Sequence, residues 1–259
     1  MTLSRRTLLG SSLLTVAVPV AMPLIASAQD ASPVPASPEA TSMDAPGYGI
    51  VRVRALPTPE LNQAVYPDVM SRFLPATSAI PGFFGYLFAF ENDNPAASLT
   101  MTLLADEAAT TQANEVAKEY VAGLDPRLTP ETPLAEQGPV RIWSTTDRTS
   151  AEVPPHLTGC QVTFRHRINA EETDIEGIIK TVNEELIPGL REMDGFVLYG
   201  WLGTSDGRIS FNIWETPEQL AAGDAYVADF VATHPIITTN GTTDVYAGTI
   251  GYADVLGPA

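Results

Sequence analysis

The chain has 259 residues, and 31 acidic against 14 basic side chains give it a formal net charge of −17. A chain this acidic repels phosphate backbones and anionic lipid surfaces, which argues against nucleic acid as a partner. Cys160 is the only cysteine, which excludes an internal disulfide, and the three histidines lack metal-ligand spacing, so no metal site is expected.

Residues 1–28 have the features of a twin-arginine signal peptide. Arg5 and Arg6 precede a modest apolar stretch at 8–25, which ends at the small-residue sequence Ala-Ser-Ala at 26–28. An uncleaved membrane anchor is the alternative, but the stretch is short and two prolines interrupt it. We expect export to the periplasm, the cell surface or the medium, with no stable membrane insertion after cleavage.

Residues 29–46 are rich in proline, alanine and serine, which predicts a disordered linker before the folded part. The rest of the chain indicates a tandem repeat, with units at 47–146 and 158–259 and a polar linker at 147–157. A shift of 113 positions pairs Pro75 with Pro188 and Gly82 with Gly195. Past the next loop the shift becomes 110. Chance alignment of apolar strands is the alternative, but it does not explain the shared proline and glycine.

Each repeat is expected to contain a strand, a helix, two strands, a helix and a strand. In the first repeat Thr58 and Pro59 begin the first helix, and the final strand lies at about 139–145. In the second repeat we expect strands at 160–168, 196–202 and 208–215, and a last strand within 243–250. Its helices are expected from residue 175 to a stop or bend at Pro188, and from Thr216 to about residue 233.

This order of elements is the ferredoxin-like plan, in which helices cover one face of an antiparallel sheet. A sheet covered on one side must bury its other face, and the second copy supplies a partner. The predicted fold is therefore α+β: two tandem ferredoxin-like units whose sheets pack face to face as an intrachain pseudo-dimeric α/β barrel. Further association of such chains stays open.

Period-2 alternation divides the strand residues into an apolar set and a mixed set. The apolar set, with Leu99, Met101, Ile209 and Phe211, is expected to lie under the helices. The mixed set is then expected to line the space between the sheets, where arginines can bind a carboxylate and aromatic rings can stack on a flat ligand. Arginine pairing with acidic residues and aromatic core packing are the alternatives. The mixed set comprises Arg52, Arg54, Tyr86, Arg165, Arg167, Tyr199, Trp201, Asn212 and Trp214.

The sequence FNIWET at 211–216 and the helix that follows it to His234 resemble a segment of the dimeric α/β-barrel superfamily, especially its antibiotic-biosynthesis-monooxygenase-like branch. The resemblance implies a monooxygenase that needs no cofactor or metal and acts on an aromatic or anionic organic compound. Trp214 and Asn212 would then shape the oxygen site, and Arg165 and Arg167 would hold the substrate. A non-catalytic extracytoplasmic ligand-binding module is the alternative, and a fold whose lumen is filled by side chains is another.

Two histidines have their own interpretations. His166 lies in the register of the apolar face, which favours a buried histidine with a polar partner. His234 ends the last predicted helix, which favours a C-terminal cap. Its place also resembles that of the heme ligand in heme-degrading members of the superfamily, so heme binding through His234 is a third functional hypothesis. The tryptophan that those enzymes carry on this helix would fall near Gly223 and is absent.

Overall fold

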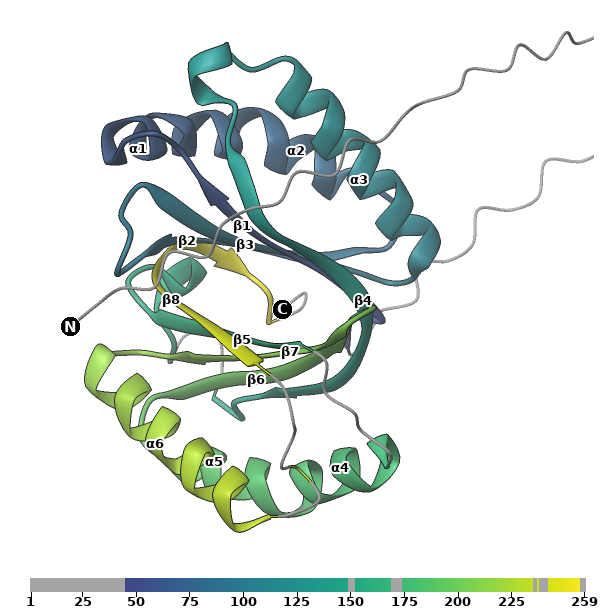
Figure 1. Ribbon diagram of the computed structural model, residues 1–259, viewed down its shortest axis with the longest axis vertical. Helices are drawn as coiled ribbons and strands as arrows, with labels where there is room; N and C mark the ends of the chain where they lie inside the picture. Colours follow the sequence, from purple (N-terminus) through teal and green to yellow (C-terminus); the bar gives the residue numbers. More distant parts are fainter. Residues whose placement is uncertain (1–44, 149–151, 169–173, 235–236, 238–241, 257–259) are drawn as a thin grey trace, which may run out of the picture. The chain divides into compact units, whose positions relative to one another are not determined.

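Eight antiparallel strands close into a barrel in the computed structural model, in the order β1-β3-β2-β8-β5-β7-β6-β4 (Figure 1). The structure describes residues 45–148, 152–168, 174–234, 237 and 242–256, so the predicted signal peptide and nearly all of the predicted 29–46 linker lie outside it. The strands are β1 (Tyr48–Ala55), β2 (Phe83–Glu91), β3 (Ala97–Leu104), β4 (Glu131–Thr145), β5 (Gln161–Ile168), β6 (Phe196–Gly203), β7 (Gly207–Trp214) and β8 (Thr242–Asp254).

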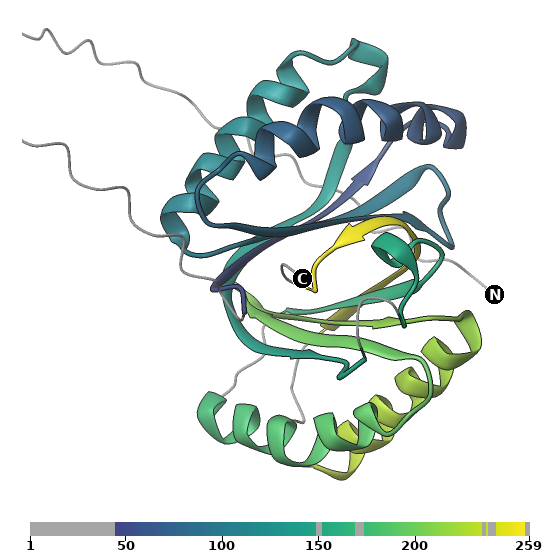
Figure 2. The same ribbon diagram turned by 180° about the vertical axis from the view of Figure 1, so that it is seen from behind.

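Helices cover the barrel on two opposite sides (Figures 1 and 2). Their starts follow the predicted signals: Thr58 caps α1, and Thr216 forms a capping box with Gln219 at the start of α6. No helix in the described ranges combines the length and apolar character needed to cross a bilayer. One side carries α1 (Pro59–Asp68), η1 (Val69–Phe73), α2 (Leu74–Ser78) and α3 (Glu107–Ala122); the other carries α4 (Ile175–Thr181), η4 (Val182–Leu186), α5 (Ile187–Arg191) and α6 (Pro217–Thr233).

The predicted stop or bend at Pro188 is a bend. The helix widens into the π-helical turn η4 just before this proline and then continues as α5, because a proline has no N–H for the regular ladder. Pro75 follows the π-helical turn η1 in the same way. Gly82 and Gly195, which precede β2 and β6, have φ angles of 83° and 77°, a left-handed conformation that glycine adopts without strain.

The sequence suggested two separate sheets packed face to face. In the structure, two long strands join the sheets into one barrel. β4 pairs with β1 along its first part and with β6 along its last part. β8 likewise pairs with both β5 and β2. These strands have 15 and 13 residues, and both are longer than predicted because each serves two sheets. The pairing closes the barrel and leaves no free sheet edge.

The apolar strand faces fill the barrel interior, and the prediction that they lie under the helices is wrong. Leu99, Met101, Ile209 and Phe211 are fully buried in one core cluster built from strands of both halves. The physical reason is that an eight-stranded barrel encloses a space just wide enough for side chains to fill. The mixed set therefore faces outward, into the layers between the barrel and the helices.

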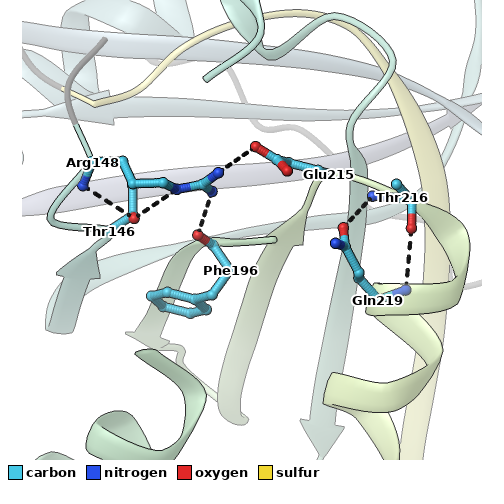
Figure 3. A network of polar contacts seen from close by, with 6 residues as sticks. All are labelled: Thr146, Arg148, Phe196, Glu215, Thr216 and Gln219. Carbon is cyan, nitrogen blue, oxygen red and sulfur yellow. Dashed lines mark hydrogen bonds and ion pairs between the residues drawn. The ribbon is translucent and has the colours of Figure 1, made fainter. Parts of the chain in front are cut away.

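Arg148 attaches the segment that follows β4 to the C-terminal half (Figure 3). Its guanidinium forms an ion pair with Glu215 at the end of β7 and donates a 2.8 Å hydrogen bond to the Phe196 carbonyl at the start of β6. Nε also donates to Thr146 Oγ1 at 3.2 Å. One partly buried side chain thus holds three segments together.

We expect Arg148→Ala to lower the free energy of unfolding by about 1–2 kcal/mol, because the charged hydrogen bonds to Glu215 and Phe196 are lost from a partly buried site. Urea unfolding measures the change. Arg127→Ala is the control: Arg127 forms an exposed pair with Asp125, and its loss should leave the urea midpoint almost unchanged. Equal effects of the two substitutions would contradict the role given to Arg148.

Candidate functional site

A cavity of about 30 Å³ lies between the barrel and the helices of the N-terminal half. Polar side chains come from β1, β2, β3 and α3, and most of the apolar ones come from α1, η1 and the turn after α3. Leu124, Leu128 and Pro130 are partly exposed, so the cavity approaches the surface at this turn. The polar residues that line it are Arg52, Arg54, Tyr86, Ser98, Thr100 and Tyr120.

The two arginines give this cavity its charge. Arg52 donates a hydrogen bond from Nη2 to Asn114 Oδ1, and Arg54 Nε is buried without a hydrogen-bond partner. In the described ranges no carboxylate lies within ion-pair distance of either guanidinium. Burial, and then the neighbouring Arg54, lowers the pKa of Arg52 to about 10, and burial also lowers the pKa of Arg54. Guanidinium groups keep their proton at neutral pH, so the cavity holds two positive charges without an internal counter-ion among the described residues.

Tyr86 places a phenol in the same cavity. Its ring is 2 per cent exposed and meets Phe73 edge-on, with 5.7 Å between the ring centroids. Burial raises the pKa of Tyr86 far above its usual value, although the two nearby arginines oppose the shift. The hydroxyl therefore keeps its proton at neutral pH and can donate it in a hydrogen bond to a bound anion.

The C-terminal half has a corresponding cavity, also of about 30 Å³, between the barrel and α4–α6. Here Arg165 forms an ion pair with Asp224 of α6, and Arg208 lies over the Trp201 ring at 4.9 Å. Burial, and then Arg167, lowers the pKa of Arg208 to about 9. The polar and aromatic residues that line this cavity are Arg165, Arg167, Tyr199, Trp201, Arg208, Ser210 and Phe230.

Equivalent arginines in the two halves thus meet different partners. Arg52 bonds the neutral side chain of Asn114, whereas Arg165 pairs with the carboxylate of Asp224, which lies 110 positions further along the chain. Asn114 is held in place by a 2.7 Å hydrogen bond that its Nδ2 donates to Gln137 Oε1. The charge of Arg52 is therefore not neutralised by its partner, whereas the charge of Arg165 is.

The predicted ligand-binding residues are brought together, but at two outer pockets and not in one space between the sheets. Arg52, Arg54 and Tyr86 line the N-terminal cavity, and the predicted residues of the second repeat line the other. The prediction of a shared lumen is wrong because the apolar faces fill the barrel interior. The residues of the second repeat are Arg165, Arg167, Tyr199 and Trp201.

Trp214 and Asn212 line neither cavity. Trp214 is fully buried beneath α6, where a Cβ at Gly223 would collide with its ring. Asn212 is also fully buried, and its Nδ2 donates to Asp224 Oδ1 at 3.3 Å. Their predicted position between the sheets is wrong for the same reason as above, and their predicted catalytic role stays a prediction.

Several cavity residues were not predicted from the sequence: Ser98, Thr100, Tyr120 and Arg208. Asn114, which contacts Arg52 without lining the cavity itself, was not predicted either and is the most informative of these residues. A helix-to-helix comparison at the 110-residue shift would have paired Asn114 with Asp224. Nothing in the local pattern says that either residue faces an arginine on the sheet.

The two predicted histidine environments are confirmed. His166 is 3 per cent exposed, with Nε2 at 3.1 Å from Asp206 Oδ1. His234 is the C-cap of α6: Nδ1 lies 2.7 Å from the Phe230 carbonyl oxygen and Nε2 lies 3.1 Å from Glu185 Oε2. Its ring also stacks on Phe230, with 3.8 Å between the centroids.

Protonated His234 should stabilise the fold. The hydrogen bond to the Phe230 carbonyl and the contact with Glu185 raise its pKa above the ordinary 6.5. The stabilisation is fully present below pH 6.5 and is lost as the pH rises through the raised pKa. We expect wild type to lose more of its urea midpoint between pH 6 and pH 9 than His234→Gln does. Identical pH profiles would contradict this assignment.

The closed barrel, the helices on its outer face and the pockets beneath them define the class: an α+β protein with the fold of the dimeric α/β barrels. No family model and no curated protein matches the chain. Among solved structures, a protein from Fusobacterium nucleatum that is provisionally assigned as a monooxygenase is 9 per cent identical, with a TM-score of 0.60 over 84 per cent of this chain and 98 per cent of that one.

Two further structures represent other activities. An anthrone oxidase-like protein is 14 per cent identical, with a TM-score of 0.56 over 85 per cent of this chain and 99 per cent of its own. A heme-binding protein from Thermus thermophilus is 10 per cent identical, with a TM-score of 0.51 over 82 and 94 per cent of the two chains. Identities this low show a shared fold alone.

The described residues around His234 do not fit a heme. Both of its ring nitrogens have partners, and its ring is stacked on Phe230. The cavity next to α6 has only about 30 Å³, which is room for about two water molecules and not for a macrocycle. Hemin added to the protein should therefore give no shifted Soret band.

Proposed function

We propose that this chain binds a small organic anion in the cavity of its N-terminal half. The observation that carries the proposal is the pair Arg52 and Arg54, two half-buried cations that have no carboxylate partner in the described part of the chain. Buried charges in proteins are normally paired, because an unpaired ion loses its hydration without compensation. A ligand carboxylate or phenolate would supply that compensation.

The cavity also limits the ligand. Its anionic group would lie between the two guanidinium groups and accept a hydrogen bond from Tyr86. The volume of about 30 Å³ accommodates that group, and the body of the ligand would extend past Leu124 and Leu128 toward the surface. Aromatic lining residues favour a flat body. The substrate class is thus a small aromatic acid or phenol.

We further propose that the ligand is oxidised by molecular oxygen without a cofactor. An electron-rich phenolate can give one electron to oxygen directly, which leaves a neutral phenoxyl radical and a superoxide anion; the arginines would stabilise the phenolate before the transfer and the superoxide after it. Two similar folds belong to proteins described as a monooxygenase and as anthrone oxidase-like, which supports this choice. A non-catalytic ligand-binding module is the second candidate, since no general base lines the cavity in the described ranges.

Calorimetry of the full chain with benzoate and with neutral benzamide tests the binding proposal. Benzoate should bind, benzamide should not, and Arg54→Gln should weaken benzoate at least tenfold. Arg141→Gln is the matched control, because Arg141 is exposed on β4 and lines neither cavity. An oxygen electrode with salicylate and with anthrone then separates the two functions: oxygen uptake indicates the oxygenase, and binding without uptake indicates the binding module. Failure of benzoate to bind would contradict both.

Two structural aspects of the proposal concern the whole chain. We infer that it is a fusion of two ferredoxin-like units, because the order of elements recurs and the π-helical turns lie 113 residues apart.

Export by the twin-arginine route, to the periplasm, the cell surface or the medium, is proposed from residues 1–28. Replacing Arg5 and Arg6 by lysine should retain the protein in the cytoplasm.

A further inference from the structure

Three side chains with metal-binding groups meet at one end of the barrel. Glu136 belongs to β4, His166 to β5, and Asp206 to the turn between β6 and β7. Their ligand atoms all lie within 4.8 Å of one another. The cluster shares no residue with either cavity described above, and His166 alternates along β5 with Arg165 and Arg167, which line the C-terminal cavity on the other face of the strand.

Glu136 and His166 reach each other across the barrel. Their strands are not neighbours in the closed sheet. Glu136 is paired with Val51, and His166 with Ile209, and both of these partners point into the barrel core. Because directly opposed residues on antiparallel strands share a face, Glu136 and His166 also point inward. The side chain of His166 is 4 per cent exposed, so an imidazole is held at the base of the cluster.

The cluster has an excess of negative charge. Glu136 and Asp206 bring two carboxylates to one imidazole, with the ligand atoms of all three side chains within 4.8 Å of one another. Two carboxylates that repel each other beside a buried imidazole form an oxygen- and nitrogen-rich set, and a cation between them would relieve the repulsion. Thr204 Oγ1 donates to Asp206 Oδ1 at 3.0 Å, an outer contact of the kind that orients a metal ligand.

We propose that Glu136, His166 and Asp206 bind a divalent transition-metal ion of the Zn²⁺ type. Ligands at about 2.0–2.2 Å from a tetrahedral ion lie about 3.3–3.6 Å apart, and His166 Nε2 is 3.1 Å from Asp206 Oδ1, close to that separation. Glu136 is only half-buried, so its side chain can rotate to close the remaining gap. The imidazole ligand selects against Mg²⁺ and Ca²⁺, which prefer oxygen. The ion would tie β4, β5 and the β6–β7 turn together and keep its other coordination positions open to solvent.

Zinc titration of the full chain, after chelator treatment and dialysis, tests this site. Calorimetry should show one Zn²⁺ per chain, and Zn²⁺ at one hundred times its Kd should raise the Tm by about 5–10 °C. Glu136→Gln and His166→Ala should each weaken Zn²⁺ binding at least tenfold. His234→Ala is the control, because His234 lies outside the cluster, and it should bind Zn²⁺ as wild type does.

Magnesium or calcium should leave the Tm unchanged. The proposal is overturned if wild type binds no Zn²⁺, or if Glu136→Gln binds it as tightly as wild type. The contact between His166 and Asp206 would then be an ion pair that fixes the turn and nothing more. If His166→Ala fails to fold, Glu136→Gln still shows whether the three side chains bind Zn²⁺. This variant should fold, because Glu136 is half-buried and its amide substitute has the same size. Neither outcome depends on anion binding by Arg52 and Arg54.

Discussion

Replacing Asn114 by aspartate is expected to weaken anion binding at least tenfold. Asn114 Oδ1 accepts a hydrogen bond from Arg52, so a carboxylate at this position would form an ion pair with the same guanidinium. Asp224 does so with Arg165 in the C-terminal half. Two unit charges about 4 Å apart attract by about 4 kcal/mol at the dielectric of a protein surface, and partial exposure makes this energy smaller. The remaining attraction still lets the new carboxylate compete with the ligand anion for Arg52.

Benzoate titration of Asn114→Asp measures this effect, and Asp224→Asn is its mirror-image control. Both substitutions exchange an amide and a carboxylate of equal size, so neither changes the packing volume. Asp224→Asn should leave benzoate affinity at the N-terminal cavity unchanged. Unchanged affinity in Asn114→Asp would show that Arg52 does not hold the anion.

Phe211→Ala is expected to lower the free energy of unfolding by about 3–5 kcal/mol, the cost of removing a large ring from a close-packed core. Phe211 is fully buried in the barrel interior, and its ring centroid lies 6.0 Å from the ring centroids of both Phe164 and Trp143. Urea unfolding gives the free energy, and Val245→Ala, at a residue that is 55 per cent exposed on β8, should cost less than about 0.5 kcal/mol.

The same variant distinguishes the barrel core from the binding pocket. Phe211 points into the barrel and lines neither cavity. A Phe211→Ala variant that remains folded should therefore bind benzoate as wild type does. A loss of benzoate affinity without a loss of stability would contradict the assignment of the interior to the core.

Local signals in the sequence predicted the local structure well. Thr58 and Thr216 begin helices as expected, and Pro75 and Pro188 mark the same bend. Each of these depends on the chemistry of one or two residues and their neighbours. The lengths of β4 and β8 could not be predicted in this way, because they depend on pairing with a strand of the other half.

The sequence also divided the strand residues correctly into two sets but assigned the sets to the wrong faces. Alternation shows that Arg52 and Val51 point in opposite directions, and it does not show which direction is inward. Both faces of the barrel strands are covered here, by the core on one side and by helices on the other; every residue of β3, for example, is buried. The closure of the barrel decides which set goes inside.

The residues that meet only in three dimensions were beyond sequence reasoning. Glu136, His166 and Asp206 lie 30 and 40 positions apart in the chain, so no spacing pattern links them. Asn114 lies on a helix, and its contact with Arg52 on β1 depends on how that helix packs on the sheet. The three-residue cluster and the contact between Asn114 and Arg52 both depend on how the elements are arranged around the barrel.

A crystal structure of the chain with 4-bromobenzoate is the most direct test of the anion site, because the bromine is located by its anomalous scattering. We predict an anomalous peak in the cavity of the N-terminal half, with the carboxylate between Arg52 and Arg54 and beside Tyr86. A peak only in the C-terminal cavity, or no peak at a saturating concentration, would contradict the proposed function.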